Sequence, residues 1–160
     1  MDAIVAVYSD WGIGRAGTQP IALSADRAYF RKTTAGAAVL CGRLTALDFP
    51  GGKPLPGRIN YLLTHRGQAP EGFTPLHTPE EALEAARSHP RFFVIGGASV
   101  YRAMLPYCTR AYVTKVEAAP VSDVFFPDLD RDPAWELVSA SPRQEEAGIF
   151  YTFCLYRRKN

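Results

Sequence analysis

The sequence predicts an α/β fold with a largely parallel sheet and helices on both of its faces. Short apolar runs rich in β-branched and aromatic residues alternate with helical patterns over the first two-thirds of the chain. This alternation is typical of parallel strands joined by helical crossovers. Two longer strand-like runs near the end, residues 135–141 and 149–157, are separated by a polar turn. They predict an antiparallel pair at one edge of the sheet.

The predicted elements follow in order along the chain. An apolar strand over residues 4–8 is followed by a long Gly-rich connection, residues 9–21, and loops of this length are often functional lids. Ser24 is expected to cap a helix over residues 25–34, which Gly36 ends. The next predicted elements are a strand at 37–41, a short helix at 44–48, a turn at 50–54, a strand at 58–64 and a short strand at 73–76.

The clearest helix start in the chain lies at Thr78. Pro79 occupies the first helical position and Glu81 follows three residues after the capping threonine, so we expect a helix that continues to about Ser88. The last predicted elements before the closing pair are a strand and helix within residues 92–106 and a strand at 111–117.

Length and composition predict one ordered domain, residues 1–160. Apolar residues make up 47% of the chain and charged residues 21%, while the net charge is only +2. We therefore expect a solid core and no nucleic acid partner. No apolar stretch has the length of a membrane span and the first residues show no signal-peptide pattern. Cys41, Cys108 and Cys154 are too widely spaced for a metal or disulfide pattern, which predicts a reduced, cytoplasmic protein without a metal site.

The most informative stretch runs from Phe92 to Tyr101. Apolar residues predict a buried strand, two glycines follow at once, and a helical pattern begins at Ala98. A strand-to-helix turn of this kind presents free backbone N–H groups at the carboxyl end of a sheet, where α/β proteins hold phosphates. Gly96-Gly97 lacks both the GxGxxG and the P-loop spacing. A turn that simply needs glycine for its backbone geometry is therefore an equal alternative.

Two further predicted strands end in donor-rich segments. Cys41-Gly42-Arg43-Leu44-Thr45 combines backbone N–H groups with a guanidinium and a hydroxyl, and Thr64-His65-Arg66 follows the next strand. Arginine suits phosphate because it can donate two parallel hydrogen bonds. Each segment alone could simply carry a surface arginine, but three such strand ends together favour one long anionic cofactor.

Asp26 is the sharpest candidate for chemistry. In the first turn of a helix a carboxylate also favours the helix dipole, and for an isolated Asp that role suffices. Phe30 and Thr33 lie on the same helical face, however, and a carboxylate beside an aromatic ring binds a cationic or N–H-rich ligand firmly. The turn Leu55-Pro56-Gly57-Arg58 sets a cation beside an apolar residue, which suits a carboxylate tail or a solvated strand end equally.

The order and spacing of these motifs resemble dihydrofolate reductases of the bacterial type, from Ile4 to the last strand. The matching residues are Val5-Ala6, Gly12-Ile13-Gly14, Pro20, Asp26, Ala28, Phe30, Thr34, Gly42-Arg43, Thr45, Leu55-Pro56-Gly57-Arg58, Asn60, Ile95-Gly96-Gly97, Val100-Tyr101, Thr114, Asp123 and Phe126-Pro127. The resemblance implies an eight-stranded, mainly parallel mixed sheet with four flanking helices and a C-terminal antiparallel strand pair. It implies NADPH-dependent reduction of 7,8-dihydrofolate to tetrahydrofolate, with hydride delivered to C6 and a proton to N5. It also implies a cytoplasmic monomer that binds dihydrofolate and antifolate-type molecules, and a cis Gly96–Gly97 bond.

The resemblance also implies roles for single residues. Asp26 would hydrogen-bond the pterin ring and favour its protonated form, assisted by Thr114. The implied substrate-binding residues are Ile4, Val5, Asp26, Arg27, Phe30, Leu55, Arg58, Ile95 and Thr114, with Arg58 on the glutamate α-carboxylate. The implied NADPH-binding residues are Ala6, Ile13, Gly14, Gly42, Arg43, Leu44, Thr45, Leu63, Thr64, His65, Arg66, Ile95, Gly96, Gly97, Ala98, Ser99, Val100 and Tyr101, with Arg43, Thr64 and Arg66 on the 2′-phosphate.

The sequence departs from the family pattern at a few positions. Ile21 follows Pro20 where the family usually has a Trp that helps to order a water near the pterin. The family pattern therefore does not define how a proton reaches the pterin in this chain. Arg27 replaces an apolar residue, and it either turns outward or supplements Arg58 on the glutamate tail. Ser99 and Leu44 stand where relatives often carry Arg and His, which makes the phosphate site less cationic.

Two other functions stay open at this point. One is a reductase on the same fold that acts on a riboflavin-precursor pyrimidine sugar phosphate, although Asp26 with Phe30 and the turn ending at Arg58 favour a folate. The other is a nucleotide-binding regulatory module without catalysis, an alternative that the absence of the loop Trp keeps open. Turnover of dihydrofolate supports the folate reductase, whereas tight NADPH binding without turnover favours the regulatory module.

Overall fold

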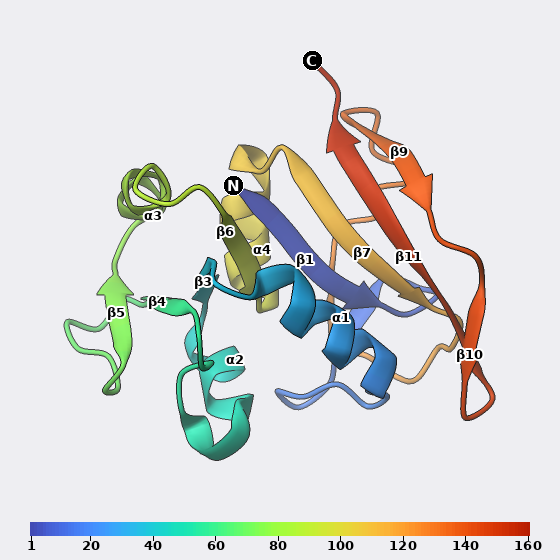
Figure 1. Ribbon diagram of the computed structural model, residues 1–160, viewed down its shortest axis with the longest axis horizontal. Coiled ribbons are helices and arrows are strands. Elements are labelled where there is room, and N and C mark those ends of the chain that lie inside the picture. Colours follow the sequence, from blue (N-terminus) through green and yellow to red (C-terminus); the bar gives the residue numbers. More distant parts are fainter.

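A twisted sheet runs through the molecule, and the computed structural model describes all of residues 1–160. Figure 1 shows α1 (Ser24–Thr34) in front of this sheet and α4 (Ala98–Met104) behind it. The main path of the sheet, in spatial order, is β10 (Gln144–Glu146), β11 (Ile149–Arg158), β7 (Arg110–Val116), β1 (Asp2–Val7), β6 (Phe92–Gly96), β3 (Ala38–Cys41), β4 (Ile59–Leu63) and β5 (Phe73–Leu76). The other elements are β9 (Trp135–Ala140), which pairs with β11 as the ninth strand, α2 (Arg43–Asp48) and α3 (Pro79–Ala86).

Neighbouring strands from β7 to β5 are parallel, whereas β11 runs antiparallel to β7, β9 and β10. The predicted α/β fold is therefore confirmed, with a mainly parallel sheet, four α-helices and a C-terminal antiparallel pair. Because β1, β3, β4 and β6 share one direction, their carboxyl ends meet at the same edge of the sheet. The three donor-rich segments follow three of these strands, so the fold brings them together.

Alternate residues of the strands supply two hydrophobic clusters, one on each face of the sheet. On one face, Val39 of β3 belongs to the cluster that Phe30 of α1 covers. On the other face, the neighbouring Leu40 packs in the cluster that contains Val94 of β6 and Met104 of α4. Strands buried on both faces explain why these segments are continuous apolar runs in the sequence.

Three short strands lie inside segments that were predicted as connections. β2 (Gly12–Gly14) pairs with β8 (Val124–Phe125) as a separate two-stranded sheet, and β10 pairs with the start of β11. The long connection after β1 is therefore partly ordered by a distant part of the chain. Strands of two or three residues carry too little periodicity to be recognised in a sequence.

The prediction that Ser24 caps α1 is wrong. The Ser24 side chain makes no capping bond to the helix. The Glu146 carboxylate of β10 accepts hydrogen bonds from the backbone N–H groups of Ser24 (2.8 Å) and Ala25 (2.9 Å) and from the Ser24 hydroxyl (2.7 Å). A carboxylate satisfies these free N–H groups and also suits the helix dipole. Thr78, in contrast, caps α3 as predicted and accepts from the Glu81 N–H at 3.1 Å.

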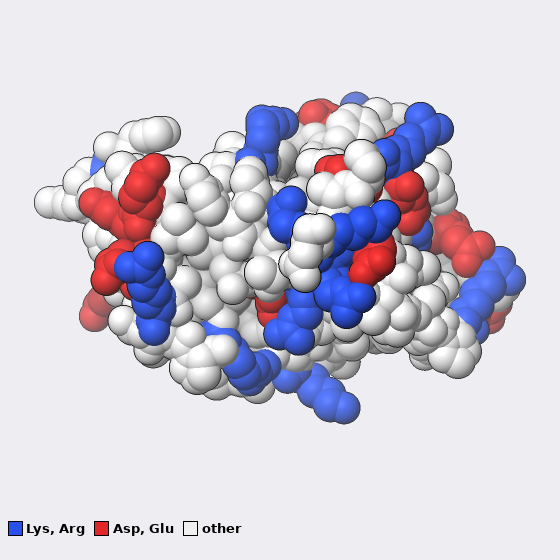
Figure 2. Space-filling view, turned by 90° about the horizontal axis from the view of Figure 1, so that it is seen from above, with Lys and Arg blue, Asp and Glu red and all other residues white.

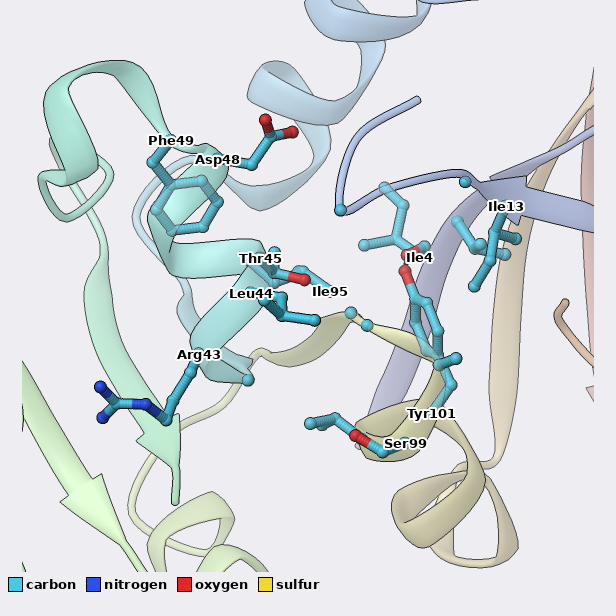
Figure 3. A pocket seen from close by; sticks show the side chains of 18 of the residues that line it. Ile4, Ile13, Arg43, Leu44, Thr45, Asp48, Phe49, Ile95, Ser99 and Tyr101 are labelled. Carbon is cyan, nitrogen blue, oxygen red and sulfur yellow. Dashed lines mark hydrogen bonds between the residues drawn. The ribbon is translucent and has the colours of Figure 1, made fainter. Parts of the chain in front are cut away.

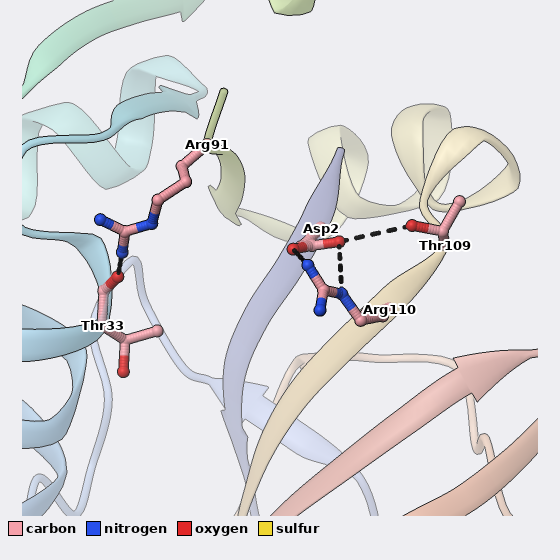
Figure 4. Close-up of polar contacts among 5 residues, drawn as sticks. All are labelled: Asp2, Thr33, Arg91, Thr109 and Arg110. Atoms are coloured by element: carbon pink, nitrogen blue, oxygen red, sulfur yellow. Dashed lines mark hydrogen bonds and ion pairs between the residues drawn. The ribbon is translucent and has the colours of Figure 1, made fainter. Parts of the chain in front are cut away.

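The other end of α1 is held by Arg91. Its guanidinium donates to the backbone carbonyls of Thr33 and Ala35, and Figure 4 shows it reaching across to Thr33. Figure 4 also shows Asp2 of β1 paired with Arg110 of β7, at an N···O distance of 3.1 Å. The helix is thus fixed at both ends by residues of the sheet and its connections.

The outer surface mixes charges of both signs on the face at the two chain ends. Figure 2 shows Lys and Arg side chains there interspersed with Asp and Glu and separated by uncharged areas.

All three cysteines are free and buried. The helices are all too short or too polar to cross a membrane.

Candidate active site

A cavity of about 1990 Å³ opens where the parallel strands end. Residues of β1, α1, α2, β6, α4 and the loop after β2 form its wall, part of which is shown in Figure 3. Sites for one small ligand usually occupy roughly 300–1,000 Å³, so this cavity has room for two molecules side by side. Ligands of α/β proteins bind in such crevices outside the carboxyl ends of the strands.

Almost all of the residues that the sequence analysis selected line this cavity. Those selected for substrate are Ile4, Val5, Asp26, Arg27, Phe30, Leu55, Arg58 and Ile95. Those selected for the cofactor are Ala6, Ile13, Gly14, Gly42, Arg43, Leu44, Thr45, Leu63, Thr64, His65, Arg66, Ile95, Gly96, Gly97, Ala98, Ser99, Val100 and Tyr101. Thr114 is the exception, because it is only 2% exposed and contacts Asp26 from outside the cavity wall. The individual roles of these residues stay predictions.

Asp26 is the carboxylate that α1 presents to the cavity. The hydroxyl of Thr114, on β7, donates a 2.6 Å hydrogen bond to its Oδ1, so this bond joins the helix to the sheet. Burial raises the pKa of Asp26, and the bond from Thr114 opposes that rise. Oδ2 forms no hydrogen bond within the protein. Asp26 can therefore bind an N–H donor through one oxygen while the other stays fixed.

Arg58 is the cavity arginine whose side chain makes the most hydrogen bonds within the protein. Its Nε donates to the Thr34 hydroxyl at 3.0 Å, and the guanidinium donates to two backbone carbonyls, one of them that of Arg31. Its central carbon lies 5.9 Å from the centre of the Phe30 ring. Burial and the nearby Arg31 lower the pKa of Arg58. Arg27 lies one helical turn before Arg31, is exposed, and also lines the cavity.

Glycines let two walls of the cavity approach each other. The Gly42 N–H donates to the carbonyl of Gly96 at 2.8 Å, and a Cβ on Gly42 would stand 3.0 Å from Val100. Gly96 has φ +133°, a conformation that other residues rarely adopt, and a Cβ there would stand 3.1 Å from the Thr45 hydroxyl. The Gly96–Gly97 peptide is cis, as the resemblance implies.

Arginine dominates the charge of the cavity. Its charged lining consists of six arginines, Arg27, Arg31, Arg43, Arg58, Arg66 and Arg102, and three aspartates, Asp26, Asp48 and Asp123, besides His65 and His77. The salt bridges of the molecule use none of these six arginines. Figure 3 shows one of them, Arg43, extending from α2 away from Thr45 and Ile95. Unpaired cations gathered in one hollow favour an anionic ligand.

Part of the cavity wall was not predicted from the sequence. Thr18 and Gln19 of the loop, Asp48 and Phe49 near the end of α2, and His77 all line the cavity. The Thr18 hydroxyl donates to Asp48 at 3.3 Å, so the loop touches α2. The length of the Gly-rich connection was the one signal that could have included the loop residues, and no local pattern marks the others.

Comparisons with known proteins agree with this geometry. The family model described as Dihydrofolate reductase matches residues 1–158. The dihydrofolate reductase of Bacillus subtilis (strain 168) is 34% identical over 160 residues, which cover 98% of this chain and 94% of that protein. The dihydrofolate reductase of Mycobacterium tuberculosis is 35% identical over 151 residues, covering 91% and 90%.

A solved structure has the same fold along almost its whole length. It is dihydrofolate reductase from Enterococcus faecalis complexed with NADP(H) and RAB-propyl, with a TM-score of 0.90 and 29% sequence identity. The match covers 99% of this chain and 96% of that one. The chain therefore belongs to the dihydrofolate reductase family.

Proposed function

We propose that this chain reduces 7,8-dihydrofolate to 5,6,7,8-tetrahydrofolate with NADPH. The observation that carries the proposal is Asp26, a carboxylate with a raised pKa that Thr114 holds inside a cavity large enough for two ligands. The free oxygen of Asp26 suits an N–H-rich ring such as a pterin. Membership of the dihydrofolate reductase family supports the same NADPH-dependent oxidoreductase activity.

The residues present fit NADPH. Gly42 and Gly96 leave space at positions where a Cβ would crowd the side chains of Val100 and Thr45, respectively. The guanidinium groups of Arg43 and Arg66 line the cavity and form no ion pair. Such groups bind the phosphate oxygens of a dinucleotide through paired hydrogen bonds. When bound, NADPH supplies the hydride for the reduction.

Asp26 does the electrostatic work on the substrate in this proposal. Its Oδ2 accepts a hydrogen bond from the pterin, and its negative charge stabilises the positive charge that grows on the ring. Thr114 holds Oδ1 and so fixes the direction of the carboxylate. The raised pKa lets Asp26 share a proton with the ring at a higher pH than an exposed aspartate does.

Arg58 binds the carboxylate tail of the substrate. Its three bonds to Thr34 and to backbone carbonyls fix the guanidinium before a ligand arrives, which reduces the entropy lost on binding. Phe30 and Leu55 supply apolar surface for the middle of the substrate. A riboflavin-precursor reductase and a module without catalysis are not favoured, because the matching curated relatives are named dihydrofolate reductases.

We also propose that the protein acts as a cytoplasmic monomer. The cavity wall described above is built from one chain, so catalysis needs no residue from a second copy. Three free, buried cysteines suit a reducing compartment.

The decisive experiment follows the loss of NADPH absorbance after addition of dihydrofolate to the purified protein. We expect turnover with dihydrofolate, and slower turnover when NADH replaces NADPH. Tight NADPH binding without turnover would instead support a nucleotide-binding module. A reductase acting on the pyrimidine sugar phosphate, but not on dihydrofolate, would support the other alternative.

A further inference from the structure

The loop after β2, residues 15–22, has one hydrogen-bond partner in the protein interior for its backbone, the hydroxyl of Tyr8. Tyr8 is 3% exposed and packs in a small cluster with Leu23, Val116 and Tyr151. Its hydroxyl donates to the carbonyl of Ile21 at 2.7 Å and accepts from the N–H of the same residue at 2.8 Å. Burial raises the pKa of Tyr8, so the hydroxyl stays protonated at neutral pH. A small cluster of this kind is typical beneath a long loop.

The other side-chain bonds of this loop are exposed to water. Asp123 accepts from the backbone N–H of Ala16 at 2.9 Å, and the Thr18 hydroxyl donates to Asp48 at 3.3 Å. Figure 1 shows the loop, in blue, passing below the sheet before it enters α1. Residues 16–19 line the cavity, whereas Tyr8 does not. The link from Tyr8 to a ligand that these contacts provide therefore runs through the position of the loop.

We propose that Tyr8 is a positioning residue whose hydroxyl holds the loop of residues 15–22 against the cavity. Both polar backbone groups of Ile21 are satisfied by this single hydroxyl. Without it, the N–H and the carbonyl must find water, and moving the loop outward is the direct way to reach it. Outward movement removes Gln19 and Ala22 from the cavity wall and admits water to the site. The effect on dihydrofolate rests on the proposed function, but the effect on the loop does not.

Trypsin measures the loop position without any ligand. Arg15 is exposed in this loop, so cleavage after Arg15 reports how often the loop leaves the surface. Tyr8→Phe removes only the hydroxyl. Tyr151→Phe is the matched control, because Tyr151 is 5% exposed in the same cluster and its hydroxyl makes no hydrogen bond. Cleavage after the exposed Arg66, in another loop, is the reference within each sample.

We expect Tyr8→Phe to speed cleavage after Arg15 about tenfold, since loss of each neutral hydrogen bond shifts such an equilibrium by roughly two- to tenfold. Cleavage after Arg66, and all cleavage of Tyr151→Phe, should stay at the wild-type rate. An unchanged rate after Arg15 in Tyr8→Phe overturns the proposal. Equal acceleration in Tyr151→Phe overturns it too, because that result reports a general loosening of the cluster.

Steady-state kinetics supply the second readout. Tyr8→Phe should raise the KM for dihydrofolate about fivefold, a loss of one or two neutral hydrogen bonds, and lower kcat less. A purely structural defect reduces the fraction of folded enzyme, which lowers kcat and leaves KM unchanged, and that pattern contradicts the proposal. If the wild-type protein does not reduce dihydrofolate, the proposed function fails, while the cleavage comparison still decides the role of Tyr8.

Discussion

Replacement of Asp26 by Asn tests the reaction site with almost no change in volume. The new amide oxygen can still accept the 2.6 Å bond from Thr114, so helix and sheet stay joined. What disappears is the negative charge that faces the substrate. Loss of one preorganised electrostatic group typically costs about 10²–10³-fold in kcat. We expect kcat/KM for dihydrofolate to fall by this amount at neutral pH.

The same substitution should stabilise the folded protein at neutral pH. Burial raises the pKa of Asp26 in the folded state above its value in the unfolded chain. Between these two pKa values the folded state binds more protons than the unfolded state, so wild-type stability falls as the pH rises through that window. The Asn variant carries no such proton. The gain in stability of the Asn variant should be complete at pH values above the pKa of Asp26 in the folded protein. It should vanish at pH values below the pKa of Asp26 in the unfolded chain.

Two measurements check this pair of effects. Initial rates of NADPH oxidation give kcat/KM, and urea unfolding at neutral and acid pH gives the free energy of unfolding. Asp48→Asn is the matched control, since Asp48 lines the same cavity but is exposed, and its side chain accepts one hydrogen bond, from the Thr18 hydroxyl. An activity loss below about tenfold, or an Asp26→Asn variant less stable than wild type at neutral pH, refutes the role given to this carboxylate.

Three further substitutions test other parts of the site. Arg27→Leu should raise the KM for dihydrofolate about two- to fivefold, the size of an exposed ion pair, with the KM for NADPH unchanged; an unaltered KM for dihydrofolate places the guanidinium in solvent. Gly96→Ala should weaken NADPH binding, measured by fluorescence titration, and cost about 1–3 kcal/mol of stability, because its φ is +133° and the Cβ would meet Thr45. Glu146→Gln should lower the urea midpoint at neutral pH, because bonds from Ser24 and the start of α1 lower the pKa of Glu146; the deficit should disappear as the pH falls through that pKa, and a deficit independent of pH contradicts the reasoning.

The sequence predicted those parts of the fold whose causes are local. The strand before Gly96 and the cap at Thr78 depend on residues within a few positions of one another, and both were predicted correctly. The cap of α1 depends on Glu146, which lies 122 residues from Ser24. No local pattern can show such a contact, so the nearest capping residue was chosen instead. β2 and β8 were missed for the same reason, since each pairs with a strand far away in the sequence.

The residues that line the candidate site were predicted more completely than the contacts that hold them in place. Resemblance selected residues that do line one cavity, because the order of strands and loops fixes which segments meet. It could not select Tyr8, which the apolar pattern assigned to the first strand and whose hydroxyl contacts a backbone rather than a side chain. Gln19 and Asp48 likewise enter the wall only through the path of the loop and the length of α2.

The cavity gathers charged side chains that form no ion pair within the protein. Elsewhere, several arginines pair with carboxylates, as in Arg143 with Glu117 and Arg157 with Glu136. In the cavity, burial and the nearby Arg31 lower the pKa of Arg58, and burial raises the pKa of Asp26, so the surroundings disfavour the charged form of each group. Arg27 and Arg31, one helical turn apart on α1, are also like charges that are unfavourable on a helix, and folding alone gives no reason to keep them. Their removal should therefore cost activity more than stability, because the compensation comes from anionic ligands that bind the folded state alone.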